Sequence, residues 1–176
     1  GAVNVADIAV LSAEAVTGDR DVKADVGANR MLLEKKYLYN FIDETMDFSD
    51  YKLLILPDVS GFSDETVEKI KKYAKNGGKI IASGESLIKD GSFILDFGAR
   101  YKGKNEFSPT YLLPCYKTVN GATEYIMRCD SFAFEAEGCE VAAYMQNPYF
   151  NRTLEHFCSH MHAPNNPDEQ FPGAVI

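Results

Sequence analysis

Three histidines and a cysteine alternate in one short segment near the end of the chain. The segment EHFCSHMHAP, residues 155–164, holds His156, Cys158, His160 and His162, which include every histidine of the protein. Imidazole and thiolate are ligands that Zn²⁺ prefers, and histidine is also a common general acid or base. The segment is therefore a candidate for a metal site or for a catalytic cluster.

The spacing limits what this segment can do alone. On an extended strand the four side chains lie on one face at intervals of about 6.5–7 Å, so neighbours can share an ion but all four cannot. On a helix, His156 pairs with His160 and Cys158 pairs with His162. A metal held by His156, Cys158 or His160 would therefore need an acid from elsewhere. The alternatives are a packed, hydrogen-bonded segment and a segment that contacts a partner.

A second group of polar residues follows the apolar strands expected in the first half of the chain. Glu14, Asp58, Ser83 and Glu85 lie at or shortly after the ends of three such strands. Ligands of open α/β sheets bind at the carboxyl ends of the strands, so these side chains are candidates for a binding crevice. Glu85 is a candidate functional acid. The alternative is that Glu85 or Ser86 caps the next helix or hydrogen-bonds a neighbouring loop.

Hydrophobic patterning indicates how these residues are positioned. Apolar runs without polar alternation predict buried strands, and apolar residues at helical spacing, with Ser63 as an N-cap, predict helices between them. The expected strands cover residues 7–11, 39–42, 51–57 and 79–83, and the expected helices cover residues 26–36 and 63–76. A long polar loop is expected over residues 14–25. This alternation predicts a mainly parallel sheet with helices on both faces.

The second half of the chain has a different pattern. Residues 91–103 resemble a helix followed by a loop. From Ser131 the apolar residues recur at every second position, and Gly138-Cys139 reads as a turn before a strand over residues 141–145. This pattern predicts an antiparallel hairpin added to the sheet. Because no linker or repeat is visible, we expect a single domain over residues 1–176.

Composition excludes several classes of function. The chain has 176 residues, is 45% hydrophobic and carries a net charge of −8, which disfavours nucleic acids and anionic membrane surfaces as partners. No apolar run approaches the roughly 20 residues that span a bilayer. The four cysteines form no CxxC pair, so we expect reduced thiols and favour the cytoplasm over the periplasm. The apolar final residues, 171–176, indicate a chain cut from a longer protein.

The turn after the strand at residues 79–83 resembles the nucleophile elbow of class I glutamine amidotransferase-like proteins. In that family the turn presents a cysteine, whereas this chain has Ser83, Gly84 and Glu85 there. The G-x-S-x-G spacing that exposes a serine nucleophile is also absent. A thiol-dependent amidotransferase mechanism is therefore not expected.

A closer resemblance is to the β-galactosidase trimerisation domain of glycoside hydrolases, in the variant of hypothetical glycosyl hydrolases and α-L-fucosidase-like proteins. It rests on GGKIIASGESL at residues 77–87, FSPTYL at 107–112 and PYFNRTLEHFCSH at 148–160, and covers roughly residues 6–164. The resemblance implies a bacterial protein with a flavodoxin-like three-layer α/β sandwich that has no active site or cofactor of its own. It would help assemble an oligomer and form one wall of the cleft in a catalytic barrel that acts on carbohydrate.

The sequence therefore predicts an accessory domain rather than an enzyme, with no residue assigned to catalysis. The alternatives are a stand-alone hydrolase, using Ser83 or Glu85 with a histidine, and a sugar-binding module that uses the strand-end crevice. The candidate cleft or interface residues are Glu14, Asp58, Ser83, Glu85, Arg152, Glu155, His156, His160 and His162.

Overall fold

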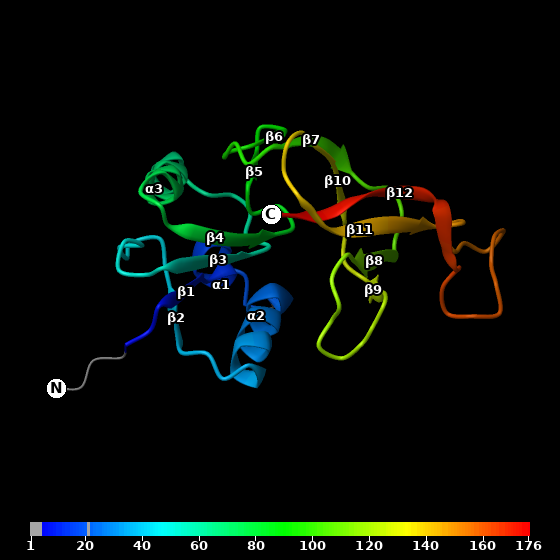
Figure 1. Cartoon of the computed structure of the whole chain (residues 1–176), viewed down its shortest axis with the longest axis horizontal. Helices are drawn as coiled ribbons and strands as arrows, with labels where there is room; N and C mark the ends of the chain where they lie inside the picture. Colours follow the sequence, from blue (N-terminus) through cyan, green and yellow to red (C-terminus); the bar gives the residue numbers. More distant parts are fainter. Residues whose placement is uncertain (1–4, 21) are drawn as a thin grey trace. The chain divides into compact units, whose positions relative to one another are not determined.

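The chain divides into two compact units, which we call unit 1 (up to Asp90) and unit 2 (from Gly91). The computed structural model describes residues 5–20 and 22–176 (Figure 1). The protein is mixed α/β, with few helices, one parallel sheet and several antiparallel strand pairs. The expectation of a single domain over the whole chain stays a prediction. No helix among the described residues is long and apolar enough to cross a membrane.

Unit 1 contains a parallel sheet of four strands in the order β2-β1-β3-β4. The prediction of parallel strands and intervening helices is confirmed. The polar loop expected over residues 14–25 is instead partly helical, because a short α1 begins at Ala13. The elements of unit 1 are β1 (Ile8–Leu11), α1 (Ala13–Thr17), α2 (Lys23–Glu34), β2 (Tyr39–Ile42), β3 (Leu53–Pro57), α3 (Asp64–Lys75), β4 (Lys79–Ser83) and β5 (Ile88–Lys89).

The two long helices of unit 1 bury one apolar side each. Ala28 and Leu32 of α2 pack with Val10 of β1 into a buried cluster. In α3, Ile70 is fully buried and Tyr73 nearly so. Ser63 caps α3, because its Oγ accepts a hydrogen bond from the Thr66 N–H at 3.1 Å. Figure 1 shows α2 and α3 on opposite sides of the four strands.

Strand β4 differs from its prediction. We expected residues 79–83 to form a buried strand, yet Ile81 is 56% exposed and only Ile80 is half-buried. The position in the sheet explains this difference, because β4 pairs with β3 alone in the order of strands that the structure describes. An edge strand has a neighbouring strand on one side only, so fewer residues surround its side chains.

Unit 2 is built from antiparallel strands. Strand β10 pairs with β7, and a second sheet has the order β12-β11-β8-β9. The elements are β6 (Ser92–Phe93), β7 (Ala99–Lys104), β8 (Thr110–Pro114), β9 (Tyr125–Met127), β10 (Phe132–Ala136), β11 (Val141–Pro148) and β12 (Asn165–Val175).

Two predictions for unit 2 are wrong. Residues 91–103 form strands rather than a helix, and the hairpin added to the parallel sheet is not formed. The apolar face of β10 packs instead against aromatic rings from earlier in the chain. The ring centroids of Phe134 and Phe93 are 6.3 Å apart, as are those of Phe132 and Tyr101. This aromatic cluster favours pairing of β10 with β7 over pairing with its neighbour in sequence.

Charged side chains support the same pair of strands. Glu135 of β10 forms ion pairs with Arg100 and Lys102 of β7. The hydrogen bond from Lys102, together with the charge of Arg100, lowers the pKa of the Glu135 carboxyl. Because these side chains are about half exposed, the ion pairs contribute to the register of the strands more than to stability.

Candidate functional site

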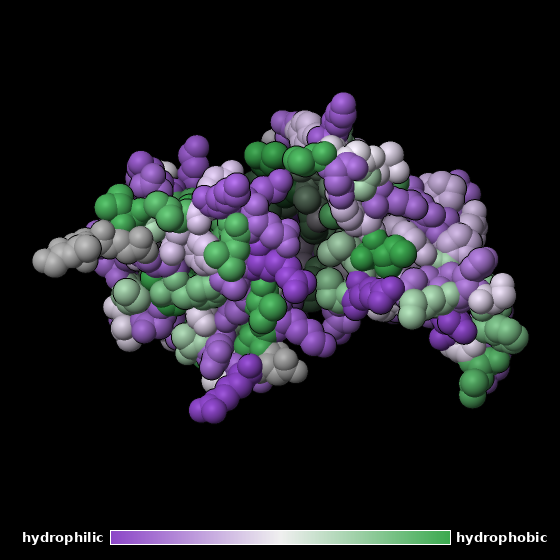
Figure 2. Space-filling view, turned by 90° about the horizontal axis from the view of Figure 1, so that it is seen from below, coloured by the Kyte–Doolittle hydropathy of each residue, from purple (hydrophilic) through white to green (hydrophobic). Residues whose placement is uncertain are grey.

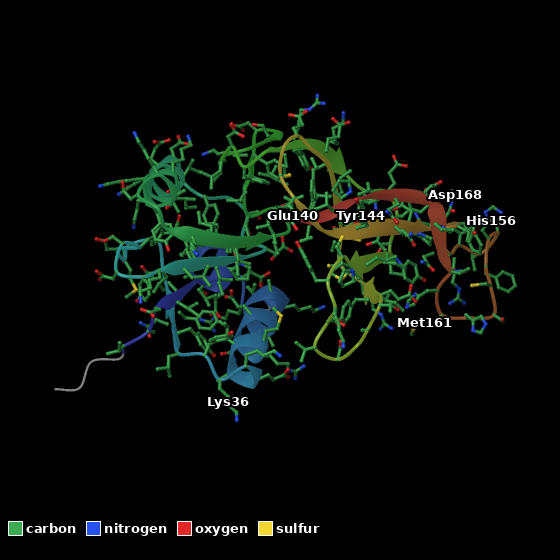
Figure 3. All side chains as sticks on the ribbon, viewed as in Figure 1. Lys36, Glu140, Tyr144, His156, Met161 and Asp168 are labelled. Carbon is green, nitrogen blue, oxygen red and sulfur yellow. The ribbon has the colours of Figure 1, made fainter. Side chains whose placement is uncertain are left out.

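The histidine-containing segment forms a long loop between the last two strands of unit 2. We call residues 149–164 the histidine loop (orange in Figure 1); Figure 3 labels His156 and Met161 on it. At its base Pro148 of β11 faces Asn165 of β12, and the Tyr149 N–H donates to the Pro164 carbonyl at 3.0 Å. The loop therefore projects from a hydrogen-bonded pair of strands.

Hydrogen bonds within the histidine loop fix its path. The Thr153 N–H donates to the His156 carbonyl at 2.7 Å, and the His156 N–H donates back to the Thr153 hydroxyl at 3.0 Å. The Arg152 Nη1 donates to the Met161 carbonyl at 3.0 Å and so links the two limbs of the loop. The Cys158 thiol faces the carbonyls of His160 and His162. These polar groups shape the loop rather than converge on one point.

The geometry does not bring the histidines together as ligands. The loop is neither a strand nor a helix, so the alternation of the four residues does not place them on one face. His156 lies against the Phe150 ring with 5.5 Å between ring centroids. Within the described residues, no group of three or more histidine, cysteine or carboxylate side chains could hold a metal ion.

The histidine loop encloses a shallow hollow with apolar walls. Its volume is about 550 Å³, and its lining residues are Ser108, Pro109, Arg152, Thr153, Leu154, Phe157, Met161 and His162. Leu154 is 93% exposed, Phe157 70% and Met161 65%. The Nε2 atom of His162 is buried there without a hydrogen-bond partner in the described structure. Large apolar side chains held in solvent mark a contact surface.

Sequence reasoning missed Leu154, Phe157 and Met161 as candidate residues. It selected the histidines for their chemistry and did not weigh the apolar residues between them. A usable signal was present, because these three large apolar residues recur at spacings of three and four among the mainly polar residues 152–162.

The carboxyl ends of the parallel strands are occupied by the chain's own carboxylates. Asp25 accepts hydrogen bonds from the Ser12 hydroxyl at 2.8 Å, from the Ala13 N–H at 2.9 Å and from the Glu14 N–H at 3.1 Å. The carboxylate therefore satisfies amides at the start of α1 that would otherwise need another acceptor. The side chain of Glu14, a predicted site residue, is exposed beside this contact.

The next two strand ends are joined in the same way. Asp58, at φ +50°, accepts a hydrogen bond from the Glu85 N–H at 2.9 Å, and its own N–H donates to the Ser83 hydroxyl at 3.1 Å. The Ser86 hydroxyl accepts from the Val59 N–H at 2.7 Å and donates to the Leu56 carbonyl at 2.9 Å. Ser86 thus hydrogen-bonds a neighbouring loop, which was one of the alternatives for this turn.

The predicted site residues divide between the two units. Glu14, Asp58, Ser83 and Glu85 lie at the strand ends of unit 1, whereas Arg152, Glu155 and the histidines lie on the histidine loop of unit 2. In unit 1 the hydrogen bonds described above link Asp58, Ser83 and the backbone of Glu85. These bonds give the strand ends a structural function.

Replacing Asp25 tests that structural function. We expect Asp25→Ala to destabilise unit 1 by about 1–2 kcal/mol, because three donors at the start of α1 lose their acceptor. Asp25→Asn retains one acceptor oxygen and should cost less. Chemical denaturation monitored by circular dichroism gives both values, and hydrogen exchange should speed up first over residues 13–17. Equal stability of Asp25→Ala and of the exposed-site variant Glu34→Ala would contradict this expectation.

Known proteins and a family model resemble this chain. The family model of the β-galactosidase trimerisation domain matches residues 30–100. Among solved structures, α-L-fucosidase isoenzyme 2 from Paenibacillus thiaminolyticus is 37% identical with a TM-score of 0.90; the match covers 98% of this chain and 28% of the fucosidase. A β-galactosidase from Bacillus circulans sp. alkalophilus is 14% identical with a TM-score of 0.63, over 85% of this chain and 26% of the other. No curated protein sequence matches.

These two kinds of match differ in what they establish. The match to the β-galactosidase shows a shared fold, whereas the match to the fucosidase extends over nearly the whole chain at substantial identity. The chain spans 28% of the length of that fucosidase. The resemblance to the β-galactosidase trimerisation domain that the sequence predicted is confirmed by the family-model match over residues 30–100 and by the similarity to the fucosidase.

Proposed function

We propose that this chain is the non-catalytic assembly domain of a longer glycoside hydrolase. The observation that carries the proposal is the match of 98% of the chain to 28% of an α-L-fucosidase, together with the trimerisation-domain match over residues 30–100. On this proposal residues 1–176 form one domain, and the carboxylates that hydrolyse the glycosidic bond lie on a catalytic barrel of the same protein. The carbohydrate is then the substrate of that barrel.

We further propose that unit 1 is a short form of the flavodoxin-like, three-layer sandwich found in amidotransferase-like proteins. Its strand order β2-β1-β3-β4 corresponds to the first four strands of the order 2-1-3-4-5 that defines flavodoxin-like sheets. The packing of α2 and α3 on opposite sides of the sheet supports the same assignment (Figure 1). The hydrogen-bonded strand ends fit a copy of the fold that serves assembly rather than catalysis.

The histidine loop is the part of unit 2 that we assign to the barrel. Covering its exposed Leu154 and Phe157 with another surface lowers the free energy of the protein, because apolar area leaves water. Arg152, which also lines the hollow, offers a cation beside them. Glu155, His156 and His160 are exposed on the same loop and would reach the rim of the cleft. This arrangement suits a wall that completes a neighbouring site.

The proposal is tested with the 176-residue chain and with the full-length protein. The chain alone should hydrolyse neither 4-nitrophenyl α-L-fucoside nor 4-nitrophenyl β-D-galactoside, whereas the full-length protein should hydrolyse one such glycoside. Phe157→Ser in the full-length protein should lower kcat/KM about tenfold or more, because the loop loses its largest apolar contact. Val119→Ser, at another exposed apolar residue of unit 2, serves as the control. Hydrolysis by the 176-residue chain alone would overturn the proposal.

A further inference from the structure

Helix α2 has a second apolar side that unit 1 does not cover. Ala28 and Leu32 face the sheet, but Val26 and Leu33 lie on the opposite side of the helix and are 62% and 59% exposed. They are seven residues apart, which is two helical turns, so they form one stripe. A helix that is apolar on both sides is normally covered on both sides.

The exposed stripe continues beyond the end of the helix. Lys36 adopts a left-handed conformation, with φ +58°, and turns the chain so that Tyr37 and Leu38 follow α2 with more than half of their surface exposed. Phe41 of β2 lies at the edge of the sheet, 40% exposed and edge-to-face with Tyr39. We call this surface the α2 face; it comprises Val26, Leu33, Tyr37, Leu38 and Phe41. Figure 2 shows the molecule from below, the side where Figure 1 places α2, with green apolar groups among purple polar ones.

Exposed cations outnumber exposed carboxylates on α2 and at its end, in a protein that is acidic elsewhere. Lys23, Arg30, Lys35 and Lys36 are exposed on or next to α2, and the structure describes no ion pair for any of the four. Figure 3 shows Lys36 pointing outward from the end of the helix. The whole chain has a net charge of −8, so the rest of its surface is strongly negative. The α2 face is therefore complementary in charge to other surfaces of an identical chain.

We propose that the α2 face is the surface on which a second copy of this chain docks, with its cations against an acidic surface of the neighbouring copy. The inference rests on the proposed assembly function and names the surface that performs it. Four of the five residues of the α2 face lie within the matched trimerisation domain, residues 30–100. A ring of three copies requires contacts between two different surfaces of each chain, and a basic apolar face opposite an acidic one meets that requirement.

The test measures self-association of the 176-residue chain by sedimentation velocity. The wild-type chain should form trimers, and Val26→Glu or Leu33→Glu should weaken association about tenfold or more, because a carboxylate enters the apolar contact. Both positions are exposed and glutamate is a good helix former, so the variants should fold normally by circular dichroism. Val119→Glu places the same charge on an exposed valine of unit 2 and should leave association unchanged.

The outcomes distinguish the surface from the function. Association that survives both Val26→Glu and Leu33→Glu would overturn the proposal that copies dock through the α2 face, while leaving the assembly function intact. Wild-type monomers of the 176-residue chain beside trimers of the full-length protein would assign the contact to another domain and would also overturn the α2 face. Monomers in both proteins would overturn the assembly function itself. Weaker association at high salt, where the surrounding cations are screened, would support the docking that we propose.

Discussion

Ile70→Ala should destabilise unit 1 by about 3–4 kcal/mol. Ile70 is fully buried on α3, so the substitution removes apolar atoms from the core and leaves a cavity that the surrounding residues fill only in part. The chain has no tryptophan, so the transition is best monitored by far-UV circular dichroism during urea denaturation. Hydrogen exchange over α3, which carries Ile70, should report the same loss.

Ile81→Ala is the matched control for this substitution. Ile81 belongs to the same unit and loses the same atoms, but it is 56% exposed on the edge strand β4. Its replacement should cost less than about 1 kcal/mol, because water already contacts most of the side chain. Equal costs for the two isoleucines would show that the core of unit 1 does not lie where the structure places it.

Gly78→Ala should have the second large effect and destabilise unit 1 by about 2–3 kcal/mol. A methyl group at this position would lie 2.4 Å from the Cε1 and Cζ atoms of the Tyr73 ring. The ring is 6% exposed and its hydroxyl donates to the Tyr51 carbonyl at 3.1 Å, so it cannot move aside without losing a buried contact. Overpacking of this kind forces side chains or backbone away from their preferred geometry. Thermal or urea denaturation measures the loss.

The neighbouring glycine separates overpacking from backbone strain. Gly77 has φ +89° and no atom within 4 Å of an added Cβ, so Gly77→Ala should cost only the strain of a left-handed residue, about 1 kcal/mol. In a Tyr73→Leu background the ring is gone, and Gly78→Ala should then cost much less than in the wild type. An unchanged cost in that background would rule out the contact with Tyr73 as the cause.

Unit 1 was predictable because its sequence patterns are local. Buried parallel strands read as continuous apolar runs, and α3 is bounded by Ser63 and by Gly77, which adopts φ +89°. The exposure of β4 was not predictable, because its sequence reads like that of the central strands. A strand's position within the sheet depends on topology, which no single segment encodes.

Unit 2 was less predictable because its pairings join distant residues. Strand β10 pairs with β7, about 30 residues earlier, with ring contacts such as Tyr101–Phe132 that no local pattern connects. No strand was predicted over β12, which contains Pro167 and Pro172. Its eleven residues form a strand because β11 offers them an unpaired edge.

The candidate site was predicted in part. The sequence located the histidine loop and the strand-end residues, but it emphasised ligand chemistry. Asp25 was missed because its partners, Ser12 and the amides after it, lie about a dozen residues away across a loop. The exposed Leu154 and Phe157 were missed because exposure depends on the path of the loop, which the hydrogen bonds of Thr153 and Arg152 determine.

The composition of β12 has a consequence for solubility. Strand β11 carries the apolar run Val141–Met145, and β12 covers one of its edges while β8 covers the other. Within the described sheet β12 is one of the two outer strands, and Pro167 and Pro172 lack the amide hydrogens that a further strand would need. Asp168 and Glu169 add repulsion along the same edge. β12 thereby shields an aggregation-prone strand from the β-strands of other molecules.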